Sequence, residues 1–151
     1  MNRFLPTIIL RHRRENLKKC SLRGLETRSD MQFFTYPIDP LPPLAGYVLL
    51  TLDAPILTKK DQNLGLFLID GTWKYAEVME RQVPPLPRRS LPPELQTSYP
   101  RKQTGCISPD RGLASVEALY AAYALMGRDP DGLLDHYYWK DAFLQKNHLI
   151  Y

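Results

Sequence analysis

Several features that mark large classes of protein are missing from this 151-residue chain. Cysteine is scarce: Cys20 and Cys106 stand alone, with no CxxC spacing and no set of histidines nearby. This usage indicates neither a zinc site nor a disulfide framework, and it predicts two reduced thiols in a cytoplasmic protein. The GxGxxG, P-loop, HExxH and GxSxG motifs are also absent, so the enzyme classes that they mark lose their best support.

Long hydrophobic runs are missing as well. The apolar stretch near the start covers residues 4–10, is interrupted by Pro6 and runs directly into the polar residues 11–14. It is too short for a signal peptide or a membrane span, so we expect no membrane partner. The chain shows no internal repeat, and its length suits one domain better than two.

Proline, by contrast, is abundant, and the charge is unevenly spread. Of 14 prolines, 12 lie between Pro37 and Pro109, which predicts turns and extended segments there and a helical end beyond Pro130. The net charge is only +4, but residues 1–28 hold eight basic and two acidic side chains, and residues 81–111 hold six and two. Such clusters suit a polyanion such as a phosphate backbone, and a solvated basic surface explains them equally well.

Hydrophobic patterning predicts an α/β fold. Short apolar strands are expected at residues 7–10, 32–36, 47–52 and 64–69. Helices are expected at residues 73–83, 115–126 and 139–150. Residues 11–28 are expected to form a loop that leads into a helix, and residues 84–100 an extended connector. Continuous apolar strands that alternate with helical segments predict a parallel sheet flanked by helices.

The most informative segment joins the strand ending near residue 69 to the next helix through Asp70, Gly71 and Thr72. A carboxylate at the carboxyl end of a strand lies at the edge where open α/β sheets bind ligands. A structural role fits these residues too, with Asp70 or Thr72 capping the helix and Trp73 filling the core.

A second candidate segment covers residues 111–118. Gly112 precedes a helix that starts at Ser115, where the hydroxyl and the helix dipole are suited to receive a carboxylate or phosphate group. Glu117, early in the helix, is a favourable structural charge toward the same dipole. An ordinary capped helix explains this spacing equally well.

Histidine and aromatic residues carry less weight. His12, His136 and His148 have no partner that the sequence places beside them, so structural or surface roles are expected. The Tyr-Tyr-Trp run at residues 137–139 has rings of the kind that stack on nucleic-acid bases. It adjoins an apolar helical stripe, however, and core packing is its expected role.

Four motifs, in order, resemble those of the DTW-domain family and the related ribosomal RNA aminocarboxypropyltransferases. Asp-Gly-Thr-Trp at residues 70–73 resembles the DTW signature, and residues 113–118 resemble the Leu-Ser/Thr-x-x-Glu-Ala element that follows it. Residues 11–15, with Cys20-Ser21 and Leu25, are similar to the first cofactor loop of the family. Residues 138–147 are similar to the ending of the rRNA enzymes.

The resemblance implies a single S-adenosylmethionine-binding domain of the SPOUT type over residues 1–151. Its parallel sheet would be flanked by helices, and residues 64–151, after an N-terminal part of about residues 1–63, would form a C-terminal trefoil knot. The implied reaction transfers the 3-amino-3-carboxypropyl group of S-adenosylmethionine to N3 of a uridine-type base in RNA. Asp70 is the candidate catalytic base for the N3 proton. The cofactor contacts carried over by position are Ser21, Leu50, Leu52, Trp73, Leu113, Ser115 and Ala118.

Structured RNA is the expected partner, with tRNA and rRNA both open: the ending resembles rRNA enzymes, whereas Asp-Gly-Thr-Trp favours the tRNA branch. Phosphate contacts without base specificity are expected from Arg11, Arg13, Arg14, Lys18, Lys19, Arg88, Arg89, Arg101 and Lys102. We expect a monomer that binds no metal. A SPOUT-type RNA methyltransferase and a noncatalytic RNA-binding or ribosome-assembly module remain as alternatives.

Overall fold

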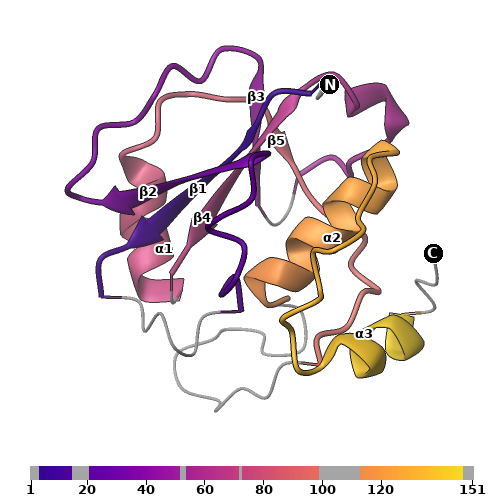
Figure 1. The fold of residues 1–151 in the computed structure, drawn as a ribbon. Helices are drawn as coiled ribbons and strands as arrows, with labels where there is room; N and C mark the ends of the chain where they lie inside the picture. The colour runs from indigo at the N-terminus through magenta and orange to yellow at the C-terminus, as the bar shows by residue number, and fades with distance from the viewer. Residues whose placement is uncertain (1–3, 15–20, 52–53, 72, 99–112, 148–151) are drawn as a thin grey trace.

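The computed structural model of the protein describes residues 4–14, 21–51, 54–71, 73–98 and 113–147. These residues form a five-stranded sheet in the order β2-β1-β4-β3-β5, and every pair of neighbouring strands is parallel (Figure 1). The strands are β1 (Thr7–His12), β2 (Met31–Tyr36), β3 (Tyr47–Leu50), β4 (Gly65–Asp70) and β5 (Arg88–Arg89). The predicted α/β class with a parallel sheet is therefore confirmed.

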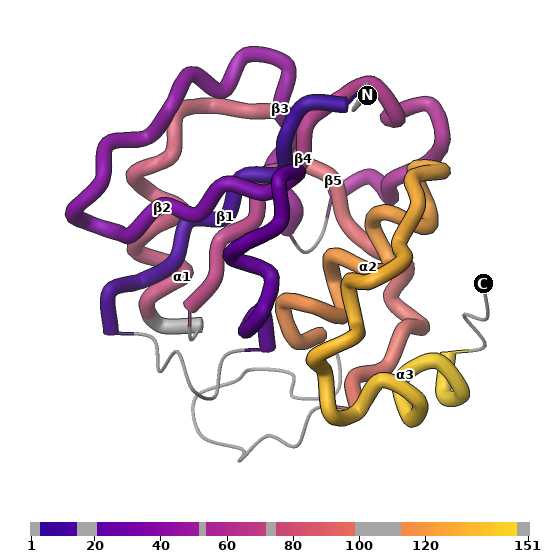
Figure 2. The backbone as a smooth tube through the Cα atoms, viewed as in Figure 1, coloured from indigo at the N-terminus to yellow at the C-terminus, as the bar shows by residue number. Residues whose placement is uncertain are grey.

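Helices cover both faces of the sheet. The helix α1 (Trp73–Arg81) packs on one face, and α2 (Ser115–Met126) and α3 (Lys140–Asn147) pack on the other (Figure 1). A short 3-10 helix, η1 (Lys59–Asp61), precedes β4. Figure 2 shows the chain after α2 running back along that helix before it enters α3.

The hydrophobic core consists of two clusters, one on each face of the sheet, because side chains along each strand alternate between the faces. In β1, Ile8 and Leu10 pack in one cluster with Met79 of α1, whereas Ile9 packs in the other with Leu119 of α2. Successive side chains of a strand point to opposite faces, so each face of β1 serves a different helical layer. All six residues of β1 are buried, as is typical of a central strand in a parallel sheet.

The predicted boundaries of α2 are confirmed. The helix ends where Gly127 adopts a left-handed conformation with φ +77°, and its N–H bonds the carbonyl of Ala124. The N–H of Arg128 then bonds the carbonyl of Tyr123 at 2.9 Å. The carbonyls of Tyr123 and Ala124 in the last turn are thereby hydrogen-bonded at a glycine C-cap.

The segment 11–28 differs from the expectation of a loop leading into a helix. β1 continues to His12, and residues 21–28 form consecutive turns that lead into β2. Leu25 N–H bonds the carbonyl of Leu22 at 3.0 Å, and Arg28 N–H bonds that of Leu25 at 3.1 Å. Residues 15–20 lie outside the described part of the chain. Isolated turn bonds of this kind satisfy the backbone locally without starting a helix.

The proline-rich connector 84–100 contains a strand that its sequence did not predict. Leu49 N–H bonds the carbonyl of Pro87 at 2.9 Å and Thr51 N–H bonds that of Arg89 at 2.9 Å, which places β5 beside β3. Since proline donates no hydrogen bond, it is tolerated beside an edge strand such as β5.

The sheet contains strands from both the N-terminal part, about residues 1–63, and the C-terminal part, residues 64–151. In this sheet β4 lies between β1 and β3. No helix in the described residues is long and apolar enough to cross a membrane.

Candidate functional site

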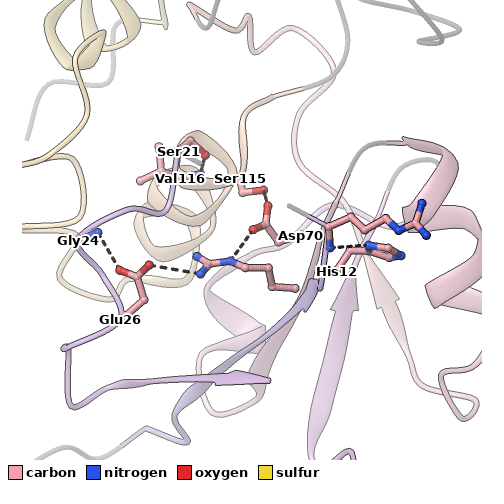
Figure 3. A network of polar contacts seen from close by, with 9 residues as sticks. His12, Ser21, Gly24, Glu26, Asp70, Ser115 and Val116 are labelled. Carbon is pink, nitrogen blue, oxygen red and sulfur yellow. Dashed lines mark hydrogen bonds and ion pairs between the residues drawn. The ribbon is translucent and has the colours of Figure 1, made fainter. Parts of the chain in front are cut away.

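The carboxyl ends of β1 and β4 lie side by side, with Arg11 in register with Asp70. Residues in register on neighbouring parallel strands point to the same face, which here is the face covered by α2. Arg11 Nε donates to Asp70 Oδ2 at 3.2 Å, and Ser115 Oγ donates to Asp70 Oδ1 at 2.8 Å (Figure 3). Arg11 and Asp70 are only 7% and 4% exposed. One buried carboxylate thus joins β1, β4 and the start of α2.

Arg11 extends this network to the loop that precedes β2. Its Nη1 donates to Glu26 Oε2 at 3.3 Å, and Glu26 Oε1 accepts the N–H of Gly24 at 2.8 Å. Burial alone raises the pKa of Glu26, but the N–H groups of Glu26 and Gly24 and the Arg11 guanidinium outweigh it and lower that pKa. Arg11 is therefore held between two carboxylates. The expected contact of Arg11 with RNA phosphates does not fit this placement, because its guanidinium is buried.

The start of α2 receives two side chains from elsewhere in the chain. Ser21 Oγ accepts the N–H of Val116 at 3.1 Å, and the Asp70 carboxylate accepts the hydroxyl of Ser115 (Figure 3). The positive end of the helix dipole favours a carboxylate at this position. A carboxylate at Ser115 was expected from the sequence, and the one found there belongs to the protein itself. Ser21, Ser115 and Asp70 are thus brought together at the start of α2.

Glu117, expected to be a structural charge toward the dipole of α2, lies in the first turn of that helix and is buried. It is 0% exposed and accepts four hydrogen bonds. Oε1 accepts from Ala114 N–H at 2.8 Å and Thr97 Oγ1 at 2.6 Å, and Oε2 accepts from Ser98 N–H and Tyr137 Oη, both at 2.9 Å. A buried carboxylate needs such compensation. Glu117 consequently ties residues 97–98, the start of α2 and the segment before α3 to one point.

His12 lies at the same edge of the sheet, on the face covered by α1. It is 9% exposed and stacks on Tyr75, with ring centroids 3.8 Å apart and planes 7° from parallel. Its Nδ1 accepts the N–H of Arg14 at 3.1 Å, so the neutral ring carries its proton on Nε2. Burial, followed by the charges of Arg14 and Arg13, lowers the pKa of His12. A structural or surface role was expected for His12, and it lies within β1 because that strand continues beyond the predicted end at residue 10.

Three of the other predicted cofactor contacts lie on the α2 side of the sheet, and a fourth begins the helix on the opposite face. Leu50 ends β3 and, like Leu113, is partly buried against the core cluster on that side, while Ala118 is buried within α2. Trp73 is the first residue of α1. Several predicted or noted residues lie outside the described part of the chain: Leu52, Lys18, Lys19, Arg101, Lys102, Cys20 and Cys106.

The remaining predicted RNA contacts differ in their surroundings. Arg13 and Arg14 are exposed just beyond β1. Arg88 pairs with Glu80 of α1, and Arg89 Nε donates to Asp61 Oδ1 at 3.3 Å. Among the described residues, no three His, Cys, Asp or Glu side chains are grouped as a metal site requires.

A cavity of about 520 Å³ lies at the opposite edge of the sheet, near the starts of β1 and β2. Its lining includes Arg28, Tyr123 and Arg128. Arg128 is 5% exposed and its Nη2 donates to the carbonyl of Leu64 at 2.5 Å, so it joins α2 to the segment before β4. This cavity is separate from the network around Asp70.

The fold and the polar network define a class: a layered α/β protein whose parallel sheet presents a carboxylate site at its carboxyl edge. Comparison with protein-family models gives no match, and neither does comparison with curated proteins. Among solved structures, the chain is similar to the SAM-dependent rRNA:acp-transferase Tsr3 from Vulcanisaeta distributa. The two chains are 24% identical, with a TM-score of 0.71, and the match covers 96% of this chain and 80% of that one. At this identity the likeness establishes a shared fold.

Proposed function

We propose that the chain is an RNA-modifying transferase that uses S-adenosylmethionine as the donor of a 3-amino-3-carboxypropyl group. The observation that carries this proposal is the buried Asp70 carboxylate at the carboxyl edge of the sheet, held by Arg11 and Ser115. It occurs in a fold shared over 96% of the chain with a SAM-dependent rRNA:acp-transferase. Asp70 and Ser115, which belong to the two motifs that carry the resemblance to such enzymes, are joined by a hydrogen bond in this network.

The residues around Asp70 suit a donor that has a large apolar ring such as adenine. The start of α2 already holds the Asp70 carboxylate, so the carboxylate of the donor is not assigned to it. Leu50, Leu113 and Ala118 add apolar surface on the same side of the sheet. We assign the donor site to these residues with Ser21, Ser115, Leu52 and Trp73. S-adenosylmethionine would supply an electrophilic γ-carbon, attacked by N3 of the base while the carbon–sulfur bond breaks and sulfur leaves as a neutral thioether.

Asp70 is the proposed acceptor of the N3 proton. Asp70 Oδ2 accepts from Arg11 Nε, and Oδ1 accepts from the Ser115 hydroxyl. The same contacts fix the direction of both oxygens, which is what a general base requires. A positioned base typically contributes about 10²–10⁴-fold to the rate.

The proposed acceptor is a uridine-type base in structured RNA, and the rRNA substrate of the structural neighbour favours rRNA over tRNA. Exposed Arg13 and Arg14, next to the network, are the described residues best placed for phosphate contacts. We propose that residues 1–151 act as one domain. The trefoil knot over residues 64–151 stays a prediction.

A double-label experiment tests the proposal. Purified protein is incubated with RNA and with S-adenosylmethionine labelled either in the carboxyl carbon or in the methyl group. We expect RNA to acquire the carboxyl label, Asp70→Ala to bind the donor yet lose most of the transfer, and Asp141→Ala, at an exposed site in α3, to match the wild type. Transfer of the methyl label instead would establish a methyltransferase. No donor binding by the wild type would favour a noncatalytic RNA-binding module.

A further inference from the structure

Tyr138 is the most exposed of the large hydrophobic side chains in the described residues, at 87%, followed by Ile38 at 69%. The sequence predicts that Tyr137, Tyr138 and Trp139 all pack in the core. Tyr137 does so, at 7% exposure, and Trp139 packs partly buried against the same core cluster. Tyr138 does not, because three consecutive side chains outside a helix cannot all face one core. A large aromatic ring is thus presented to solvent.

The backbone that presents this ring is held on both sides. Tyr137 N–H bonds the carbonyl of Leu134 at 3.0 Å, and Lys140 N–H bonds the carbonyl of Tyr137 at 3.2 Å. Tyr137 Oη donates to the buried Glu117, and the Tyr138 ring meets Trp139 edge to face, with centroids 5.1 Å apart and planes at 73°. A ring fixed in this way loses little conformational entropy when a ligand stacks on it.

Tyr138 also lies close in the chain to a contact with the candidate site. The ring of His136 packs so tightly on Gly24 that a Cβ there would lie 2.4 Å from His136 Cδ2, and Gly24 has φ +94°. Gly24 in turn donates its N–H to Glu26, the outer carboxylate of the Arg11 network (Figure 3). The segment that displays Tyr138 is therefore packed against the loop that borders Asp70.

We infer that Tyr138 is a stacking platform for an unpaired base of the RNA substrate, an inference that rests on the proposed function. An exposed aromatic face accepts any base, because every base has a π-face. Charges of both signs lie close to Tyr138 in the chain, since Lys140 pairs with the exposed Asp135 at 3.8 Å, so the ring and not the local charge carries the inference. Tyr138 thus orients single-stranded RNA at the rim of the site, and the ring contacts no donor.

Binding of two RNA probes tests the inference: a fluorescent hairpin with an unpaired uridine loop, and a fully paired duplex of equal length. We expect Tyr138→Ala to weaken hairpin binding roughly 5- to 150-fold and to leave duplex binding unchanged. Tyr138→Phe and Tyr138→Trp, which keep a ring, should bind the hairpin as the wild type does. Ile38→Ala, at an exposed apolar position after β2, is the matched control and should change neither affinity.

Several results would overturn the inference. These are equal hairpin affinity for Tyr138→Ala and the wild type, equal losses for Tyr138→Ala and Tyr138→Phe, and loss of duplex binding as well. A wild-type dimer that Tyr138→Ala converts to a monomer would assign the ring to contact between copies of the chain. Donor titration keeps the two proposals apart. If wild-type protein binds the donor and modifies RNA while Tyr138 proves irrelevant, only the stacking platform fails.

Discussion

Asp70 and Arg11 form a buried pair whose two members depend on each other. Arg11 has a second acceptor in Glu26, and Asp70 has a second donor in Ser115. Removing one member of a buried pair leaves a desolvated charge, whereas hydrogen bonds from neutral groups compensate it only in part. The pair therefore orients the carboxylate and makes substitutions at Asp70 a test of both stability and chemistry.

Substitution of Asp70 by Asn separates the charge of the side chain from its shape. The amide keeps an oxygen for the Ser115 hydroxyl but cannot take the N3 proton. We expect Asp70→Asn to reduce transfer about 10²–10⁴-fold while donor affinity changes far less. Single-turnover rates and donor titration measure the two effects. Asp141→Asn is the control at an exposed carboxylate, and full activity of Asp70→Asn would remove Asp70 from the chemistry.

His12 makes stability depend on pH. Its pKa in the folded protein is lowered below the ordinary value of 6.5 by burial, Arg14 and Arg13. Between that lowered pKa and 6.5 the unfolded chain binds more protons than the folded one, so the free energy of unfolding falls as pH drops below 6.5. Urea unfolding over a pH series should show this slope. His12→Phe keeps a ring beside Tyr75 and should flatten it; an identical slope would contradict the assignment.

Some of these residues are predictable from sequence and others are not. Asp70 is predictable because a carboxylate after a buried strand must lie at the carboxyl edge of a parallel sheet. The burial of Arg11 is not, because it follows from the register of β1 against β4, which brings Arg11 opposite Asp70. The exposure of Tyr138 likewise depends on how the chain turns before α3, and local pattern carries no signal for that.

At the scale of elements, Glu117 connects more of the chain than any periodicity indicates. Glu117 lies on α2 and accepts hydrogen bonds from residues 97–98, which precede that helix in the chain. It also accepts one from Tyr137, which precedes α3. Asn147 of α3 adds a second tie, since it exchanges hydrogen bonds with the backbone of Gln96 at 2.7 and 2.8 Å. The segment before α2 is thereby fixed by both helices on this face.

Glu117→Leu should be strongly destabilising. It leaves two buried and two partly buried donors without their acceptor, and each buried donor costs about 1–3 kcal/mol. We expect the free energy of unfolding in urea to fall by about 3 kcal/mol or more, with Glu117→Gln intermediate. Glu77→Leu, at an exposed position of α1, should change it by less than about 0.5 kcal/mol. Near-neutral behaviour of Glu117→Leu would show that the tie contributes little.

Some strands and helices are predictable from the sequence, and others are not. The four apolar strands and three helices are predictable because each has a clear period or a continuous apolar run. β5 is not, since two arginines between prolines have no apolar pattern, and its existence depends on the exposed edge of β3. The turns in place of a helix at residues 21–28 follow from local hydrogen bonds that composition does not reveal.

For the whole molecule, the modest net charge of +4 implies that RNA binding depends on local basic residues. Each phosphate contact releases counterions, so affinity should fall steeply with salt. Exposed Arg13 and Arg14 are the described candidates, and replacing both by Ala should reduce the slope of log affinity against log salt by about 2. Fluorescence titration at several salt concentrations measures this slope. An unchanged slope in the double variant would place the contacts elsewhere.

The central claim, transfer of an aminocarboxypropyl group to RNA, is tested most directly by mass spectrometry of RNA nucleosides. RNA from cells that lack the gene is compared with RNA from wild-type cells, before and after treatment with purified protein and S-adenosylmethionine. We expect one uridine-derived nucleoside to lack the aminocarboxypropyl mass in the deletion strain and to regain it on treatment, and its position assigns the substrate to rRNA or tRNA. A regained methyl mass, or identical nucleosides in both strains with no gain on treatment, would contradict the account.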